Sequence, residues 1–201
     1  ARYLKDSVGV EYCPKNQILV SVGGSEAIDL CVRALVKPGD EVLIPEPSFV
    51  CYDPIVQLAG GTPVSIETKV ENQFRLTPEE LEEKITPRTK LLVLPYPNNP
   101  TGAVMKREHL EAIAPVIQRH DLLVLSDEIY SELTYSGKHV SIASLPGMDQ
   151  RTVVINGFSK SFAMTGWRLG FAAGPAPILQ LMVKIHQYAI MSAPTMSQYA
   201  A

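Results

Sequence analysis

One short stretch of the sequence places a lysine and an arginine where both could act on a small molecule. Lys160 follows an apolar run, and Arg168 comes eight residues later. A lysine in apolar surroundings, eight residues before an arginine, can lose its proton and form a Schiff base with a carbonyl group. Taken alone the pattern is weak, because most loop lysines are solvated and most arginines pair with carboxylates.

A carboxylate stands in a similar position after another apolar run. Asp127 follows residues 122–125, in the segment Ser-Asp-Glu-Ile-Tyr at 126–130. In an open parallel sheet, ligands bind beyond the carboxyl ends of the strands, so Asp127 could hold a pyridine nitrogen protonated. The alternative is that Asp127 or Glu128 caps a following helix through the helix dipole.

Two further segments have the composition of ligand-binding turns. Residues 96–102 read Tyr-Pro-Asn-Asn-Pro-Thr-Gly, which is equally typical of an ordinary sharp turn. Residues 22–27 read Val-Gly-Gly-Ser-Glu-Ala, where two glycines precede a helix start and expose backbone N–H groups to an anion. This second segment matches neither the dinucleotide fingerprint nor the Walker loop, so it does not indicate a dinucleotide or NTP site.

Seven short runs rich in Val, Ile and Leu predict the strands that position these segments. The runs are apolar throughout, as in strands covered by helices on both faces, and helical patterns separate them. The sequence therefore predicts an α/β fold, with a mostly parallel sheet between two layers of helices. The predicted strands cover residues 17–22, 41–44, 63–66, 90–94, 122–126, 152–155 and 169–173.

The helices are predicted from their end signals. Thr77 and Glu80 form a capping box that opens a helix reaching residue 85. Further helices are predicted over residues 25–36, 107–120 and 176–193, the second of them with a kink at its internal proline. The chain begins in what reads as a helix tail and ends without a stop signal, so we expect it to be a piece of a longer protein.

Composition excludes several classes of protein. Of the 201 residues, 18 are Lys or Arg and 21 are Asp or Glu, so the net charge of −3 lacks the basic surplus of a nucleic-acid binder. No apolar run approaches the ~18–20 residues that span a bilayer, and charged residues near the start replace the apolar part of a signal peptide. We therefore expect a globular protein that binds neither membranes nor nucleic acid.

The cysteines and histidines give no sign of a metal centre. The three cysteines lack a C-x-x-C spacing, so we expect idle thiols in a reducing compartment, which predicts a cytoplasmic location. The four histidines are not spaced as metal ligands, and we interpret them as surface or helix residues: His109, His120, His139 and His186.

Five segments, taken in order, resemble the fold-type I pyridoxal-phosphate (PLP) enzymes, in particular the class I/II aminotransferases. They are GGSEA at 23–27, PEPSF at 45–49, NNPTG at 98–102, SDEIY at 126–130 and SKSFAMTGWRLG at 159–170. The resemblance covers nearly the whole chain, and the last segment is the most specific. It implies PLP as the cofactor and transfer of an amino group between an amino acid and a 2-oxo acid.

The resemblance also implies a role for each matched residue around the cofactor ring. Lys160 matches the lysine that forms the Schiff base and moves a proton to and from the substrate. Asp127 matches the acid that keeps the ring nitrogen protonated, so that the ring withdraws electrons. Tyr130 and Asn99 match the pair that hydrogen-bonds the ring hydroxyl, with a cis peptide bond after Asn99, and Phe49 matches the aromatic side chain stacked on the ring.

A second group of matched residues would bind the phosphate. Arg168 offers a fork for two oxygens, and the backbone N–H groups of Gly24, Ser25 and Glu26 would supply further donors. Glu26 would contribute its backbone alone, because its carboxylate would repel a phosphate. Ser159 could add a hydroxyl donor.

The chain also departs from the family pattern. Family members are about twice as long, with an N-terminal segment and a smaller C-terminal domain that carries the arginine for the substrate carboxylate. We therefore interpret residues 1–201 as the large PLP-binding domain of a protein that is expected to form a homodimer. The amino donor is not predicted.

Three other functions stay open from the sequence. A PLP-dependent carbon–sulfur lyase would use the same lysine, aspartate and arginine. A binding fragment would take up the cofactor without turnover. A nucleotide-binding α/β domain would carry out no covalent chemistry at all.

Overall fold

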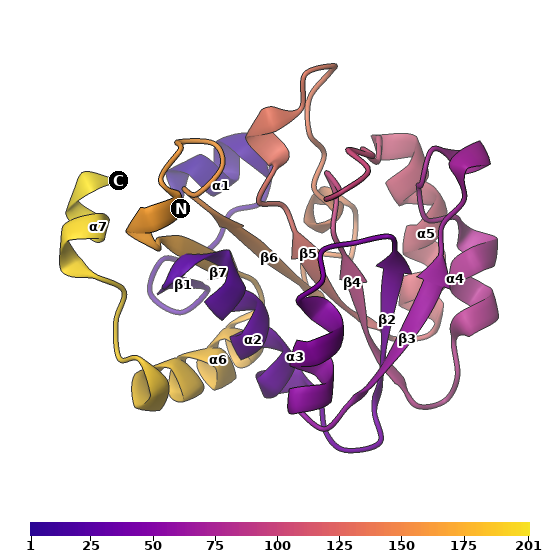
Figure 1. The fold of residues 1–201 in the computed structure, drawn as a ribbon, viewed down its shortest axis with the longest axis horizontal. Helices are drawn as coiled ribbons and strands as arrows, with labels where there is room; N and C mark the ends of the chain where they lie inside the picture. Colours follow the sequence, from indigo (N-terminus) through magenta and orange to yellow (C-terminus); the bar gives the residue numbers. More distant parts are fainter.

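All residues, 1–201, are described by a computed structural model whose centre is one seven-stranded sheet (Figure 1). The strands, in chain order, are β1 (Ile18–Ser21), β2 (Glu41–Glu46), β3 (Thr62–Glu67), β4 (Thr89–Leu94), β5 (Leu123–Asp127), β6 (Thr152–Gly157) and β7 (Gly170–Ala173). Their order in the sheet is β1-β7-β6-β5-β4-β2-β3, and only the two pairs that involve β7 are antiparallel. The predicted mostly parallel sheet is confirmed, and each predicted strand overlaps an observed one.

Seven α-helices flank the sheet. They are α1 (Arg2–Ser7), α2 (Gly23–Leu35), α3 (Tyr52–Leu58), α4 (Pro78–Lys84), α5 (Arg107–Arg119), α6 (Ala176–Ala189) and α7 (Thr195–Ala200). Short 3₁₀ turns occupy Val70–Asn72, Ser131–Leu133, Ile142–Ser144 and Thr165–Trp167. None of the helices is both long and apolar enough to cross a bilayer.

The core has two sides because alternate strand residues point to opposite faces of the sheet. Val153 and Ile155 of β6 pack in one buried cluster with residues of α2, α3 and α6, whereas Val154 packs on the other face with Leu4 of α1. Helices α4 and α5 cover that second face beside β4, through buried side chains such as Ile113. The three-layer α/β/α architecture is therefore confirmed.

Local signals predicted most helix boundaries, and the differences concern α3, α6 and α7. The capping box of α4 is present, with Thr77 Oγ1 accepting the N–H of Glu80 at 3.3 Å. Helix α5 contains Pro115 in its interior, as the sequence predicts. Helix α6 ends at Ala189 rather than at residue 193, since Met191 has a left-handed backbone (φ 77°) that breaks the helix before α7. Helices α3 and α7 were not predicted, because both are short and have no side-chain cap.

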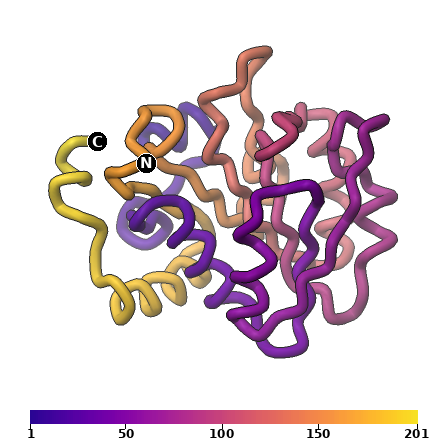
Figure 2. Tube along the Cα trace, viewed as in Figure 1, coloured from indigo at the N-terminus to yellow at the C-terminus, as the bar shows by residue number.

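One edge of the sheet gathers the segments that carry the candidate residues. Strand β1 runs parallel to β6, because both are antiparallel to β7. The carboxyl ends of β1, β2, β4, β5 and β6 therefore meet at the same edge as the start of β7, which follows Arg168. The tube view shows the two chain ends close together on one side of the molecule (Figure 2), where Ala1 and Ala201 line a common apolar groove.

Candidate active site

A pocket opens at this carboxyl edge of the sheet. Nine of the ten candidate residues line it, and Glu26 is the one that does not. The pocket wall also contains residues that the sequence did not single out, among them Tyr52, Ile129 and Thr165. The nine candidates are Gly24, Ser25, Phe49, Asn99, Asp127, Tyr130, Ser159, Lys160 and Arg168.

The Asp127 carboxylate is the buried acid of this pocket. It is the last residue of β5, only 6% exposed, and it accepts hydrogen bonds from the Tyr52 hydroxyl at 2.8 Å and the Ile129 N–H at 3.2 Å. Burial raises the pKa of Asp127, and the hydrogen bonds from Tyr52 and Ile129 offset part of that effect. A cation in the pocket would lower this pKa again, so the site favours a positively charged group facing Asp127.

Tyr52 is a site residue that sequence reasoning missed. It begins α3, three residues after Phe49, and the two rings meet edge to face with centroids 6.2 Å apart. Burial, followed by the charge of Asp127, holds the pKa of Tyr52 well above its ordinary value, so the hydroxyl stays protonated and donates to Asp127. The Phe49-x-x-Tyr52 spacing, which fits one turn of helix, was the only available signal.

Lys160 lies in the turn after β6, with its Nζ 5.5 Å from the centre of the Tyr130 ring. Its side chain is exposed, so the expectation of a lysine desolvated by apolar neighbours is wrong for this structure. The reason is its position, because helices cover the faces of the sheet but leave the carboxyl edge open. Phe49, at 39% exposed, is likewise a wall of the pocket rather than a core residue.

Asn99 reaches the pocket from the turn that follows β4. The peptide bond after it is cis, as the family resemblance implies. The bonds Glu46–Pro47 and Tyr96–Pro97 are also cis, which the sequence analysis did not foresee. The neighbouring Asn98 is buried and fixes this turn, because its Oδ1 accepts from the N–H of Thr101 at 3.1 Å and from its hydroxyl at 2.7 Å.

Elsewhere in the pocket wall, glycines allow an arginine to lie against the start of α2. Gly23 has φ +78°, and a Cβ there would lie 2.7 Å from Arg168 Nη2. A Cβ on Gly170 would lie 2.6 Å from the carbonyl carbon of Gly23, so β7 approaches this turn as closely as a backbone can. Arg168 Nη1 donates to the carbonyl of Thr165 at 2.8 Å, while Gly24 and Ser25 line the pocket from the first turn of α2. We call this group of Gly24, Ser25 and Arg168 the anion cradle.

Glu26 faces away from the pocket. One carboxylate oxygen accepts the N–H of Val22 at 2.5 Å, and the other lies 2.7 Å from His186 Nδ1. This orientation agrees with the expectation that Glu26 offers only its backbone to a bound anion. His186 is buried and is therefore not a surface residue. It lies on α6, so only the helix part of the interpretation from the sequence is correct for it.

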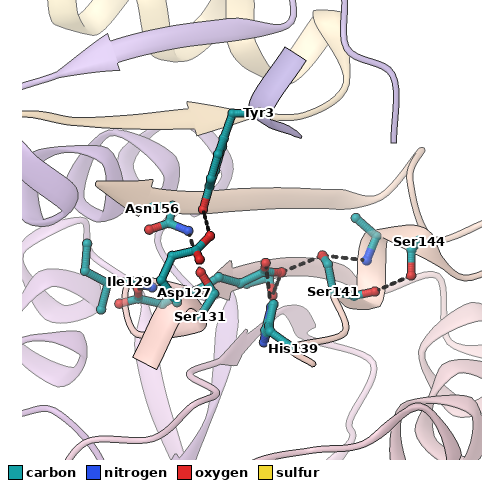
Figure 3. A network of polar contacts seen from close by, with 12 residues as sticks. Tyr3, Asp127, Ile129, Ser131, His139, Ser141, Ser144 and Asn156 are labelled. Carbon is teal, nitrogen blue, oxygen red and sulfur yellow. Dashed lines mark hydrogen bonds and ion pairs between the residues drawn. The ribbon is translucent and has the colours of Figure 1, made fainter. Parts of the chain in front are cut away.

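Behind the pocket, a polar network fixes the turn that follows β5 (Figure 3). Glu128 is 1% exposed, and its carboxylate accepts the hydroxyls of Ser126 at 2.9 Å and Ser141 at 2.5 Å. His139 Nε2 lies 2.8 Å from the second carboxylate oxygen, and Asn156 Nδ2 donates to Ser131 at 2.9 Å. His139 is neither on a helix nor fully exposed, so its interpretation from the sequence is wrong.

Comparison with known proteins identifies the family. The family model described as aminotransferase class I and II matches residues 1–201. The chain is 50% identical to an aspartate aminotransferase of Pyrococcus abyssi and 48% identical to aromatic-amino-acid aminotransferase 2 of Thermococcus litoralis, in each case over all of this chain and 52% of the relative.

The solved structures agree. The crystal structure of an aromatic aminotransferase from Pyrococcus horikoshii superposes with a TM-score of 0.97 at 48% identity, over 100% of this chain and 54% of that one. The chain thus spans about half the length of the curated relatives it matches. On the whole-chain match and the shared fold, the chain belongs to the class I and II aminotransferase family.

Proposed function

We propose that the protein is an aminotransferase, which moves an amino group between an amino acid and a 2-oxo acid with PLP as its cofactor. Members of this family use PLP. The observation that carries the proposal is the convergence of Lys160, the buried Asp127 and Arg168 on one pocket, from two separate segments of the chain. A lysine nucleophile, a buried acid and a phosphate-binding guanidinium are the groups that this cofactor requires.

The residues present fit the cofactor. The anion cradle offers backbone N–H groups at a helix start and a guanidinium that has one hydrogen bond inside the chain, to Thr165. The raised pKa of Asp127, caused by burial, creates a need for a cationic partner, which a protonated ring nitrogen meets. Phe49 forms an exposed aromatic wall of the same pocket.

When bound, PLP supplies an aldehyde for covalent attachment and a ring that withdraws electrons from the substrate Cα. Lys160 Nζ would hold the cofactor, release it to the amino acid, and then accept the proton from Cα. The Asp127 carboxylate, oriented by Tyr52, would keep a proton on the ring nitrogen. Tyr130 and Asn99 would donate hydrogen bonds to the ring hydroxyl, and Arg168 would hold the phosphate.

Ser159 and the cradle backbone complete the proposed set. Ser159 lines the pocket and is 9% exposed, which supports a hydroxyl donor close to the phosphate. Gly24, Ser25 and the N–H of Glu26 belong to the first turn of α2, whose 13 residues give a favourable dipole for an anion. These roles follow from the match of residue types to the family pattern and from their shared position.

The proposal extends to assembly, domain organisation and location. We propose that residues 1–201 are the large PLP-binding domain and that the protein is a homodimer. Large apolar side chains left exposed on and after α6 are suitable for a subunit interface: Tyr188, Met191, Met196 and Tyr199. The three cysteines form no disulfide, which supports a cytoplasmic location.

A turnover assay separates this function from its alternatives. The protein would be loaded with PLP and given amino donors, including aspartate and aromatic amino acids, with and without 2-oxoglutarate. We expect a new amino acid to form only with the oxo acid and to disappear in the Lys160→Ala variant. Pyruvate and ammonia released from cystathionine without an oxo acid would instead indicate a carbon–sulfur lyase.

Two further results would also contradict the proposal. Cofactor uptake without any turnover would leave a binding function alone. The absence of lysine-dependent uptake would favour a nucleotide-binding domain without covalent chemistry, which a nucleotide-binding measurement on the same sample would then support.

A further inference from the structure

An ionisable pair lies directly behind the anion cradle, and none of the proposed roles uses it. His186 Nδ1 of α6 lies 2.7 Å from Glu26 Oε1 of α2, although 160 positions separate the two residues. The side chains are 7% and 12% exposed, so the pair is largely removed from water. Figure 1 shows α6 alongside α2, and the two helices are in contact.

Because of the position of Glu26, the orientation of its carboxylate affects how well the anion cradle can bind a phosphate. It belongs to the first turn of α2, directly after Gly24 and Ser25, which line the pocket. It is also three residues from Gly23, against which the Arg168 guanidinium lies, and residues three apart share one side of a helix. A carboxylate free to turn here would repel a phosphate and would compete with it for Arg168.

The observed contacts hold the carboxylate out of that position. Glu26 Oε2 accepts the N–H of Val22, the residue that precedes α2, at 2.5 Å. Glu26 Oε1 is taken by His186, so both oxygens are engaged on the side away from the pocket. Because His186 comes from another helix, the packing of α6 on α2 fixes where the negative charge of Glu26 lies.

We propose that His186 is a positioning residue for the anion cradle, which holds the Glu26 carboxylate on the Val22 N–H and so leaves Arg168 and the start of α2 free for a phosphate. The inference rests on the proposed function, because the phosphate in question is that of PLP. It adds a determinant of phosphate affinity that lies outside the pocket.

The alternative is that the pair only stabilises the packing of α6 against α2. In that case its loss would change the shape of the whole site, and therefore the binding of any ligand there. A positioning role would affect a ligand that carries a phosphate and spare one that lacks it. It would also depend on the charge of Glu26, which can be removed independently of His186.

The test compares PLP with pyridoxal, which has the same ring and aldehyde but no phosphate. Dissociation constants of both would be measured for the unaltered protein and for His186→Leu, His186→Met, His186→Asn and the double variant Glu26→Gln/His186→Leu. Melting temperatures would show which variants fold, and His186→Met provides a second removal of the imidazole if His186→Leu does not fold.

We expect His186→Leu to bind PLP about tenfold more weakly, equivalent to about 1.4 kcal/mol, with pyridoxal binding unchanged. His186→Asn keeps a donor near the place of Nδ1 and should bind PLP as the unaltered protein does. The double variant should regain PLP affinity, because a neutral amide neither repels a phosphate nor competes for Arg168.

Equal losses of PLP and pyridoxal affinity in His186→Leu, or no recovery in the double variant, would overturn the inference and leave the proposed function intact. Unchanged PLP binding in both removal variants would do the same. If the unaltered protein failed to bind PLP, the proposed function itself would fall, and this inference with it.

Discussion

Asp127 and Glu128 are neighbours in the sequence, and both are buried, yet their carboxylates face different cavities. Asp127 lines the candidate active site, where Tyr52 is the one side chain that donates to it. Glu128 faces the polar network behind the pocket, which we call the rear network. There, two serine hydroxyls and His139 surround its oxygens. Burial of a charge is therefore no mark of function by itself.

The two carboxylates differ in how much of their hydrogen-bonding capacity their partners leave free. The partners of Glu128 come from the protein and saturate the carboxylate, so its contribution is to hold the turn after β5 in place. Asp127 keeps acceptor capacity toward an open pocket and has a pKa raised by burial, which a cationic ligand would relieve. The comparison predicts that changes at Asp127 reduce activity and that changes at Glu128 reduce stability.

The largest effect should come from removing the pocket acid. We expect Asp127→Ala to lower kcat/KM of the loaded enzyme by roughly 10²–10⁴-fold, because nothing would then keep the ring nitrogen protonated. The melting temperature should change little, since no other side chain except Tyr52 depends on this carboxylate. Steady-state kinetics and thermal unfolding on one preparation would measure both, and an activity within a fewfold of the unaltered enzyme would contradict the assignment.

The matched change in the rear network should reduce stability and leave activity nearly unchanged. Glu128→Ala leaves Ser126, Ser141 and His139 without their common acceptor, and we expect the free energy of unfolding to fall by about 3 kcal/mol. Urea denaturation would measure the loss. Activity per folded molecule, at a temperature where the variant is folded, should stay within a fewfold of normal. A loss of activity as large as that of Asp127→Ala would break the distinction.

A smaller effect is expected at Tyr52, which connects the pocket wall to Asp127. Tyr52→Phe removes one hydroxyl that donates at 2.8 Å, and we expect kcat/KM to fall about fivefold, or roughly 1 kcal/mol. The ring and its edge-to-face contact with Phe49 stay in place, so stability should be nearly unchanged. An unaltered pH–rate profile together with unaltered kcat/KM would show that the hydroxyl does not support Asp127.

The smallest effect concerns pH and the stability of the cofactor-free protein. Since burial raises the pKa of Asp127 in the folded state, the folded protein binds this proton more tightly than the unfolded chain. The resulting stability is fully present below the ordinary aspartate value of about 3.9 and is lost as pH rises through the raised pKa. Asp127→Asn should remove this loss.

The measurement is the difference in unfolding free energy between Asp127→Asn and the unaltered protein at each pH, so that other carboxylates cancel. We expect the variant to gain stability relative to the parent as pH rises. A difference that does not vary with pH would mean that Asp127 titrates alike in the folded and unfolded states.

The sequence predicted those parts of the molecule that depend on local signals. Each of these signals spans only a few neighbouring residues, whose types are enough to favour the structure that forms there. The signals are the seven apolar runs, the Thr77 capping box and the ordered motifs. Nine of the ten candidate residues line one pocket, because they lie at strand ends, in the loops that connect the strands or at a helix start, all at the same edge of the sheet.

The partners of these residues could not be predicted from the sequence. Tyr52 donates to Asp127 across 75 positions, and His186 meets Glu26 across 160, so both contacts depend on the strand order and on how the helices pack. The exposure of Lys160 is also a property of the assembled edge, since the apolar residues near it in sequence do not surround it in space.

Chemical trapping would show whether Lys160 forms the proposed covalent bond with PLP in this pocket. The protein would be loaded with PLP, reduced with borohydride to make the lysine–cofactor bond permanent, digested and mapped by mass spectrometry. We expect one labelled peptide, with the label on Lys160, and a strongly reduced yield of label in Arg168→Ala. An unlabelled Lys160, or a label spread over other lysines, would contradict it.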